Sequence, residues 1–130
     1  LVVCDEGIVH RSITLFVSPR PQLDLARLRS FLGSWAFPDG VVHVRASLER
    51  CAERAWSRGV PKRLEREGDA ELRGFLEACT TVSVEIAREA RRRGLPVLEI
   101  DNEHPNAEAL LESPQCAALV DTLLPKRGRC

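Results

Sequence analysis

Two acidic residues stand directly behind an uninterrupted apolar run at the start of the chain. Leu1–Cys4 is followed by Asp5, Glu6 and Gly7. An apolar run without alternation is typical of a parallel strand buried on both faces, and ligands of open α/β sheets bind beyond the carboxyl ends of such strands. We therefore predict that Asp5 and Glu6 lie where chemistry would take place. The alternative is that Asp5 only begins a turn or caps the next helix.

Three arginines recur at intervals of four residues in the middle of the chain. Arg50, Arg54 and Arg58 would project along one stripe of a helix. Residues 60–68 then add three more basic side chains, Arg63 among them, without a core pattern. Such a stripe and segment could clamp a polyphosphate, because guanidinium groups bond phosphate oxygens in pairs. A solvated helix face, with glutamates of the same helix as ion-pair partners, is an equally good interpretation of the spacing.

A polar loop follows the apolar segment 97–101, again at the expected carboxyl end of a strand. Its residues are Asn102, Glu103, His104, Pro105 and Asn106. His43, in contrast, is one polar residue inside the β-branched run 41–45. We interpret His43 as a core or edge histidine with a local partner rather than as a catalytic group.

Strands alternate with helices along the chain. We predict strands at 1–5, 41–45 and 97–101, and helices at 8–17, 25–35, 48–58, 70–93, 107–112 and 114–124. The predicted N-caps of three helices are Asp24, Ser47 and Asp69. Arginines 91–93 suit the negative end of a helix dipole and are interpreted as structural. The alternation indicates right-handed crossovers and one α/β domain, a three-layer sandwich with a parallel sheet covered on both faces.

The composition narrows the class of protein. The chain has 130 residues, of which 44% are hydrophobic, and equal numbers of basic and acidic residues, 19 each. Zero net charge disfavours a general nucleic-acid or anionic-membrane partner. The sequence has neither a run of about 18 apolar residues nor a signal-peptide pattern, so we expect a cytoplasmic location. The five scattered cysteines form no C-x-x-C pair, which disfavours a disulfide framework and a zinc site.

Three segments, in order and spacing, resemble the later half of P-loop nucleotide and small-molecule kinases, the thymidylate and adenylate kinase-like group. They are LVVCDEG, VVHVRASLERCAERAWSRGVPKRL and LPVLEIDNEHP. The resemblance covers about the whole chain. It implies a P-loop NTPase-like α/β fold that binds ATP and Mg²⁺ and transfers a phosphoryl group to a nucleotide or another small-molecule acceptor.

The resemblance also implies roles for individual residues. Asp5 would be the Walker B carboxylate that serves Mg²⁺ through water, and Glu6 would orient water or substrate. The arginines of a lid over the phosphates would be Arg54, Arg58 and Arg63. The wall near the base would be formed by Asn102, His104 and Pro105.

The chain departs from that family in lacking G-x-x-x-x-G-K-[ST], the loop whose backbone N–H groups hold the phosphates. Either this loop precedes Leu1 in a longer protein, as the absence of methionine suggests, or the chain is a degenerate relative without turnover. The alternative function is a non-catalytic nucleotide-sensing or assembly module, and a homo-oligomer is compatible with either function. A flavodoxin-like or receiver-like domain fits less well, because it would need more acidic strand ends and a lysine on a late strand.

In the resembled fold, the strand that feeds the phosphate loop lies between the strands at 1–5 and 41–45. Without it, each of these strands has unpaired backbone groups, at a cost of about 1 to 3 kcal/mol for each buried group. We therefore expect the chain to pair the two strands directly, to take a strand from a partner, or to be unstable.

Overall fold

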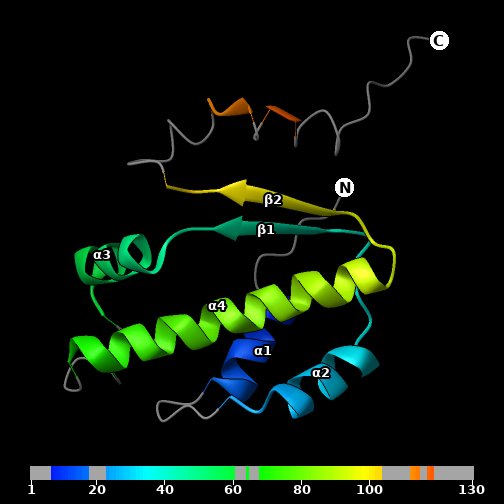
Figure 1. Ribbon diagram of the computed structural model, residues 1–130, viewed down its shortest axis with the longest axis horizontal. Helices are drawn as coiled ribbons and strands as arrows, with labels where there is room; N and C mark the ends of the chain where they lie inside the picture. The colour runs from blue at the N-terminus through cyan, green and yellow to red at the C-terminus, as the bar shows by residue number, and fades with distance from the viewer. Residues whose placement is uncertain are drawn as a thin grey trace.

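The computed structural model describes residues 7–17, 23–60, 64, 68–103, 112–114 and 117–118. Its elements, in chain order, are α1 (Ile8–Phe16), α2 (Leu25–Ser34), β1 (Val41–Arg45), α3 (Leu48–Arg58), α4 (Asp69–Arg92) and β2 (Val97–Asp101) (Figure 1). Helices and parallel strands together confirm the predicted α/β class at this coarse level. No helix in the described part combines the length and the apolar character needed to cross a membrane.

The two strands pair in parallel, with Val41 opposite Val97 and Arg45 opposite Asp101. Both strands have the predicted bounds. Parallel neighbours need a long crossover, which α3 and α4 supply here. The strand predicted at 1–5 lies outside the described residues. Of the helices predicted after β2, only short pieces are described, in which Pro114 is helical and the N–H of Ala117 donates to the carbonyl oxygen of Ser113.

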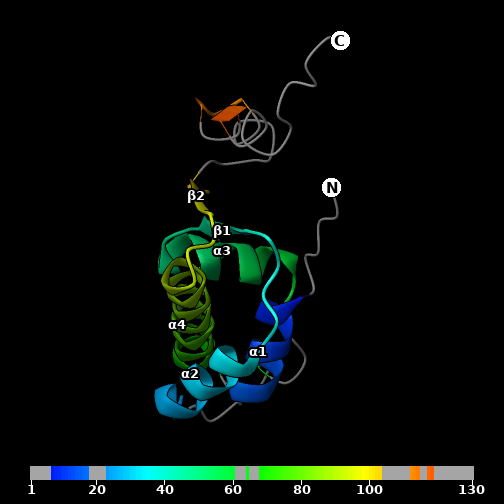
Figure 2. The same ribbon diagram turned by 90° about the vertical axis from the view of Figure 1, so that its right-hand side faces the viewer.

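Helix α4 is the element against which the others pack. It contacts α1 and α2 on one side, and α3 and both strands on another (Figures 1 and 2). The apolar residues between 72 and 90 recur with the period of one helix face, but the structure also buries Ala78, Glu85 and Ala87, which lie off that face. This periodicity underestimates the buried surface, because a helix with neighbours on two sides needs a wider one than an amphipathic surface helix.

The main core lies between α1, α2 and α4. Leu28 and Leu32 of α2 and Val82 and Ile86 of α4 are all at most 1% exposed. Phe31 packs at the margin of this core with its ring 5.3 Å from that of Phe16, between centroids. Burial of each such aliphatic side chain contributes about 1.5 to 3 kcal/mol, so this cluster fixes α1 and α2 on α4.

Two predicted N-caps are confirmed and one is wrong. Asp24 accepts a hydrogen bond from the N–H of Arg27 at 3.0 Å, and Ser47 caps α3 in the same way. At α4 the cap is Gly68, with φ +93°, and Asp69 is the first helical residue. The Asp69 carboxylate instead accepts from Arg73 Nε at 2.7 Å and from the Trp56 ring N–H at 3.2 Å, and these bonds lower its pKa. A carboxylate in the first turn still interacts favourably with the helix dipole.

The described helices lie on the β1 side of the strand pair, not on both sides of a central sheet (Figure 2). Val42 and Val44, which share one face of β1, are 43% and 51% exposed. His43, on the other face, is 7% exposed and lies against α4, where its Nε2 is 3.3 Å from Ser83 Oγ. The described residues thus cover one face of the sheet, and the predicted third layer is not among them.

Arg93 ties the end of α4 to the end of α2. Its guanidinium donates to the backbone oxygens of Leu32, Gly33 and Trp35 at 2.7 to 2.8 Å, and to Glu89 at 2.8 Å. It also lies over the Phe37 ring, 4.4 Å from the centroid. The last carbonyls of a helix have no partner within the helix, so Arg93 completes α2 from another element. For Arg93 this confirms the structural interpretation.

Replacing Arg93 by alanine is expected to lower the free energy of unfolding by about 2 to 4 kcal/mol, because several charge-assisted hydrogen bonds are lost together. Arg93→Lys should lose part of this free energy of unfolding, since an ammonium group lacks the planar guanidinium fork that reaches several carbonyls. Arg92→Ala is the comparison variant and should cost less, because the Arg92 side chain is 68% exposed and bonds Glu89 of the same helix rather than α2. Urea unfolding gives the free energy of unfolding of all three variants. Equal losses in the Arg93→Ala and Arg92→Ala variants would contradict the role given to Arg93.

Glu89 makes the free energy of unfolding depend on pH at acidic pH values. Hydrogen bonds from Arg92 and Arg93 lower the pKa of Glu89 from 4.5 to about 2 in the folded chain. Because the folded pKa is the lower one, this contribution is complete above about pH 4.5 and is lost as the pH falls towards 2.

We expect Glu89→Gln to flatten the fall in unfolding free energy between pH 4.5 and 2, as measured by urea titrations across that range. Glu71→Gln, at the exposed start of α4, serves as the control. If both variants keep the wild-type slope, Glu89 is not the group responsible.

Candidate functional site

The carboxyl ends of β1 and β2 meet the start of α3 at one end of the molecule. The arrowheads of both strands point towards α3 in Figure 1. The N–H of Asn102, just after β2, donates to the carbonyl oxygen of Arg45, the last residue of β1, at 2.7 Å. The strands therefore stay joined up to their tips, and the residues that follow them are held side by side. Ligands of parallel sheets bind at such ends.

Ser47 and Glu103 join the two strand tips. The Ser47 hydroxyl donates to Glu103 Oε2 at 3.1 Å, and the Ser47 backbone N–H donates to Glu103 Oε1. The same hydroxyl accepts the N–H of Arg50 at 3.2 Å as the α3 N-cap. A carboxylate thus lies at the N-terminus of α3, where the helix dipole favours negative charge.

Arg54 and Asn102 are two predicted site residues that the structure brings together. Arg54 Nη2 donates to Asn102 Oδ1 at 3.3 Å, from the second turn of α3 to the loop after β2. The residues are 48 positions apart in sequence. The Arg54 guanidinium at the strand tips is a group that can bond phosphate oxygens. The amide oxygen of Asn102 and the carboxylate of Glu103 are oxygen ligands, which suit a hard cation such as Mg²⁺.

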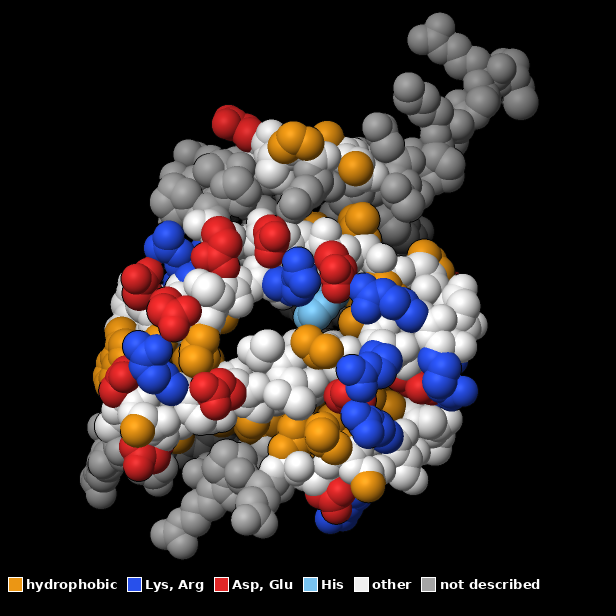
Figure 3. All heavy atoms as spheres, viewed as in Figure 1, with side chains coloured by type: hydrophobic (Ala, Val, Ile, Leu, Met, Phe, Trp, Pro, Cys, Tyr) orange, Lys and Arg blue, Asp and Glu red, His pale blue; other side chains and the backbone are white. Residues whose placement is uncertain are grey.

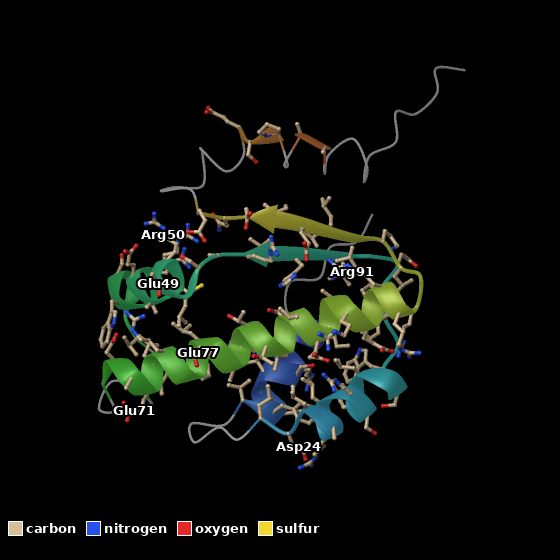
Figure 4. All side chains as sticks on the ribbon, in the orientation of Figure 1. Asp24, Glu49, Arg50, Glu71, Glu77 and Arg91 are labelled. Carbon is tan, nitrogen blue, oxygen red and sulfur yellow. The ribbon has the colours of Figure 1, made fainter. Side chains whose placement is uncertain are left out.

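The arginine stripe predicted from the sequence divides into separate roles. Arg50 forms an ion pair with Glu53 of the same helix at 2.9 Å, and Arg54 turns to the strand tips. Arg58 is the last residue of α3 and is exposed. Figure 4 shows Glu49 and Arg50 on α3, beyond the ends of the strands. The ion-paired interpretation of the spacing therefore describes Arg50, whereas Arg54 bonds Asn102 at the strand tips.

Five of the predicted site residues lie outside the described part of the chain. They are Asp5, Glu6, Arg63, His104 and Pro105. Within the described part, no group of three or more His, Cys, Asp or Glu side chains could hold a metal ion. The predicted metal role of Asp5 therefore stays a prediction.

An open hollow adjoins the strand tips. It has a volume of about 380 Å³ and is lined by Ala46, Leu48, Glu77, Thr80 and Thr81. The first two residues join β1 to α3, and the other three lie on α4. Figure 3 shows an opening through the molecule between β1 and α4, and Figure 4 shows Glu77 on the stretch of α4 opposite α3. The hollow shares the β1–α3 junction with Ser47, so space is available beside the site.

His43 and Glu99 belong to the side of the sheet rather than to its tips. His43 Nδ1 is 3.6 Å from Glu99 Oε1, and Arg91 donates to the same oxygen at 2.8 Å. The bond from Arg91 is the main cause that lowers the pKa of Glu99, and Arg45 and His43 add to it. These contacts support the structural interpretation of His43.

Sequence analysis missed the pairing of Ser47 with Glu103. Ser47 was assigned only a capping role, and Glu103 was one of several polar residues in a loop. The register of the two strands is the signal that identifies this pair, because Arg45 lies opposite Asp101. Counting two residues further along both segments places Ser47 beside Glu103.

Ser47→Ala is expected to lower the free energy of unfolding by about 1 to 2 kcal/mol, since it removes both the cap of α3 and a hydrogen bond to Glu103. Ser47→Thr should retain most of the stability, because it keeps the hydroxyl. Ser57→Ala, at an exposed position of the same helix, is the control. Thermal unfolding reports the difference. Identical midpoints for Ser47→Ala and Ser57→Ala would show that the junction contributes nothing.

Comparison with protein-family models, curated proteins and solved structures finds no match to this chain. The likeness to P-loop kinases therefore rests on the sequence segments alone. The function has to be inferred from the geometry of the strand tips.

Proposed function

We propose that the chain is part of an ATP-dependent phosphotransferase, similar to the nucleotide and small-molecule kinases, and that the tips of β1 and β2 face the nucleotide. The observation that carries this proposal is the contact of Arg54 with Asn102 at 3.3 Å. The sequence resemblance implies that both residues line the nucleotide site. The two groups lie together at the end of a parallel strand pair, where nucleotides bind in α/β folds.

Each residue has a defined task in this proposal. Asp5 holds Mg²⁺ through water, and Glu6 orients water or the acceptor. Arg54, with Arg58 and Arg63 on the lid side, offsets the negative charge of the phosphates. When bound, Mg²⁺ neutralises charge on the phosphate oxygens. Phosphoryl transfer depends mostly on positioning and charge neutralisation, so these groups supply what the reaction needs.

The donor set is compatible with this chemistry but incomplete. Carboxylate and amide oxygens at strand tips are ligands that Mg²⁺ accepts, and a guanidinium suits phosphate. The 130 residues contain no G-x-x-x-x-G-K-[ST] loop. The proposal therefore requires a phosphate-binding loop from outside this sequence, and it expects the 130-residue chain alone to bind ATP weakly.

Isothermal titration with ATP and Mg²⁺ tests the nucleotide site. Arg54→Ala is expected to weaken binding about tenfold, the scale of one charge-assisted hydrogen bond. Arg92→Ala removes the same charge near the amino end of β2, at the other end of α4, and should leave binding unchanged. Equal affinities of the two variants would remove Arg54 from the site, and the absence of any heat of binding in the wild type would contradict a nucleotide site at the tips.

The rate of phosphoryl transfer tests whether Asp5 takes part in the mechanism. In a protein that includes the phosphate loop, Asp5→Asn is expected to lower the rate of phosphoryl transfer by at least about 100-fold, the scale of losing one preorganised electrostatic contact. Near-normal transfer from ATP to a nucleotide or small hydroxyl acceptor would exclude Asp5 from the mechanism.

A second candidate is a non-catalytic nucleotide-sensing or assembly module. The missing phosphate loop favours it, because tight phosphate binding and turnover depend on that loop. Binding of ATP without release or transfer of phosphate would support the sensor. No binding would support an assembly role or an enzyme of which these 130 residues are only a part.

A further inference from the structure

We propose that the apolar segment Leu1–Cys4 of the same chain adds to the free edge of β1 as a third parallel strand. This inference concerns the 130-residue chain by itself, without the phosphate loop that the proposed function requires from outside the sequence. It starts from three features of β1: an unpaired edge, an exposed apolar face and a hollow beside it.

The edge follows from the register of the sheet. The N–H of Val41 donates to the carbonyl oxygen of Pro96 at 2.9 Å, and the carbonyl oxygen of Arg45 accepts from Asn102 at 2.7 Å. In a parallel pair, alternate residues face the same neighbour. The backbone groups of Val42 and Val44 therefore point away from β2. Among the described residues β1 pairs only with β2, so these groups lie on an open edge.

The surroundings of that edge suit an added strand. The side chains of Val42 and Val44 are 43% and 51% exposed, so an apolar neighbour can cover them. The hollow of about 380 Å³ lies just beyond the α3 end of β1, between the β1–α3 junction and α4. Figure 3 shows an opening between β1 and α4. Edge strands with exposed apolar faces are normally covered or paired.

Leu1–Cys4 has the composition and length for this place. It carries no charge and contains two adjacent valines, which favour strands. Four residues at about 3.3 Å each span most of a strand as long as β1. The segment is joined through residues 5–7 to α1, which packs on α4. Covalent attachment gives it a high effective concentration at the edge compared with a second copy of the chain.

The direction of the added strand follows from its connection. More than 30 residues, including α1 and α2, separate Cys4 from Val41, and both helices lie on the α4 side. Parallel strands are joined by such long helical crossovers, whereas antiparallel neighbours are usually joined by short turns. Leu1–Cys4 would therefore run in the same direction as β1 and deliver Asp5 and Glu6 towards the tips. A phosphate-loop strand from outside the chain would have to displace Leu1–Cys4 from this edge.

Amide hydrogen exchange and proton–proton contacts, both measured by NMR on the 130-residue chain, test the proposal. We expect the amides of Val42 and Val44 to be protected, and we expect contacts between protons of Val2 or Val3 and those of Val42 or Val44. Val2 and Val3 are adjacent, so the backbone N–H of one of them faces β1, and replacing both by proline should raise the exchange rates of these two amides at least about tenfold. The amides of Val41 and Asn102, which bond within the β1–β2 pair, are the internal control.

Val3→Thr, which keeps a β-branched side chain and the N–H, should retain the protection. If the proline variant does not fold, the proton–proton contacts of Val2 or Val3 with Val42 or Val44 in the wild type test the strand pairing instead. Rapid exchange of Val42 and Val44 in the wild type would overturn the proposal. So would protection that survives the replacement of both Val2 and Val3 by proline, or protection that increases with protein concentration, since the latter would identify a second copy as the occupant.

Discussion

The burial of α4 on two sides is the constraint on which the rest of the structure depends. On one side Val82 and Ile86 close the core with α1 and α2, and on another Ser83 meets His43 of β1. An amphipathic surface helix needs one apolar stripe, whereas α4 also buries Glu85, which is paired with Arg29 at 2.8 Å. A buried carboxylate is tolerated when cations satisfy it. Because α4 touches every other element, it fixes the distance between the helical core and the strand tips.

This arrangement also positions the strand tips. Helix α4 spans the molecule from its junction with α3 to the start of β2, so it sets both ends of the crossover. The bond between Asn102 and Arg45 then joins the tips, and Ser47 with Glu103 ties α3 to them. Arg54 reaches Asn102 because α3 begins immediately beyond β1. The candidate site is thus built by short connections at one end of the sheet.

Much of the fold followed from local sequence signals. The strands at 41–45 and 97–101, the helix at 48–58 and the caps at Asp24 and Ser47 depend on apolar periodicity and on side chains that bond their own backbone. The errors have tertiary causes. Asp69 was taken for a cap, but its carboxylate is engaged by Arg73 and Trp56, and the left-handed Gly68 precedes the helix. The burial of Glu85 could not be inferred, because its cation Arg29 comes from another helix.

The candidate site was predictable in position but not in detail. Residues after parallel strands could be placed at one end, and Arg54 and Asn102 are both there. The pairing of Ser47 with Glu103 required the strand register, which the sequence did not specify. Among the described residues β1 pairs only with β2, which agrees with the expectation that the sheet needs another strand, whereas Asp5 and Glu6 lie outside those residues. The geometry therefore supports a binding surface more directly than it supports catalysis.

The central claim is that the tips of β1 and β2 bind a magnesium nucleotide. Titration of the isotope-labelled chain with ATP and Mg²⁺, followed by NMR chemical shifts, tests it most directly. The account predicts that the largest shifts occur at Ser47, Arg54, Asn102 and Glu103, with little change at Gly40 and Val97 at the opposite ends of the strands. Shifts confined to the opposite ends, or to α1 and α2, would contradict it, and so would the absence of shifts at millimolar nucleotide.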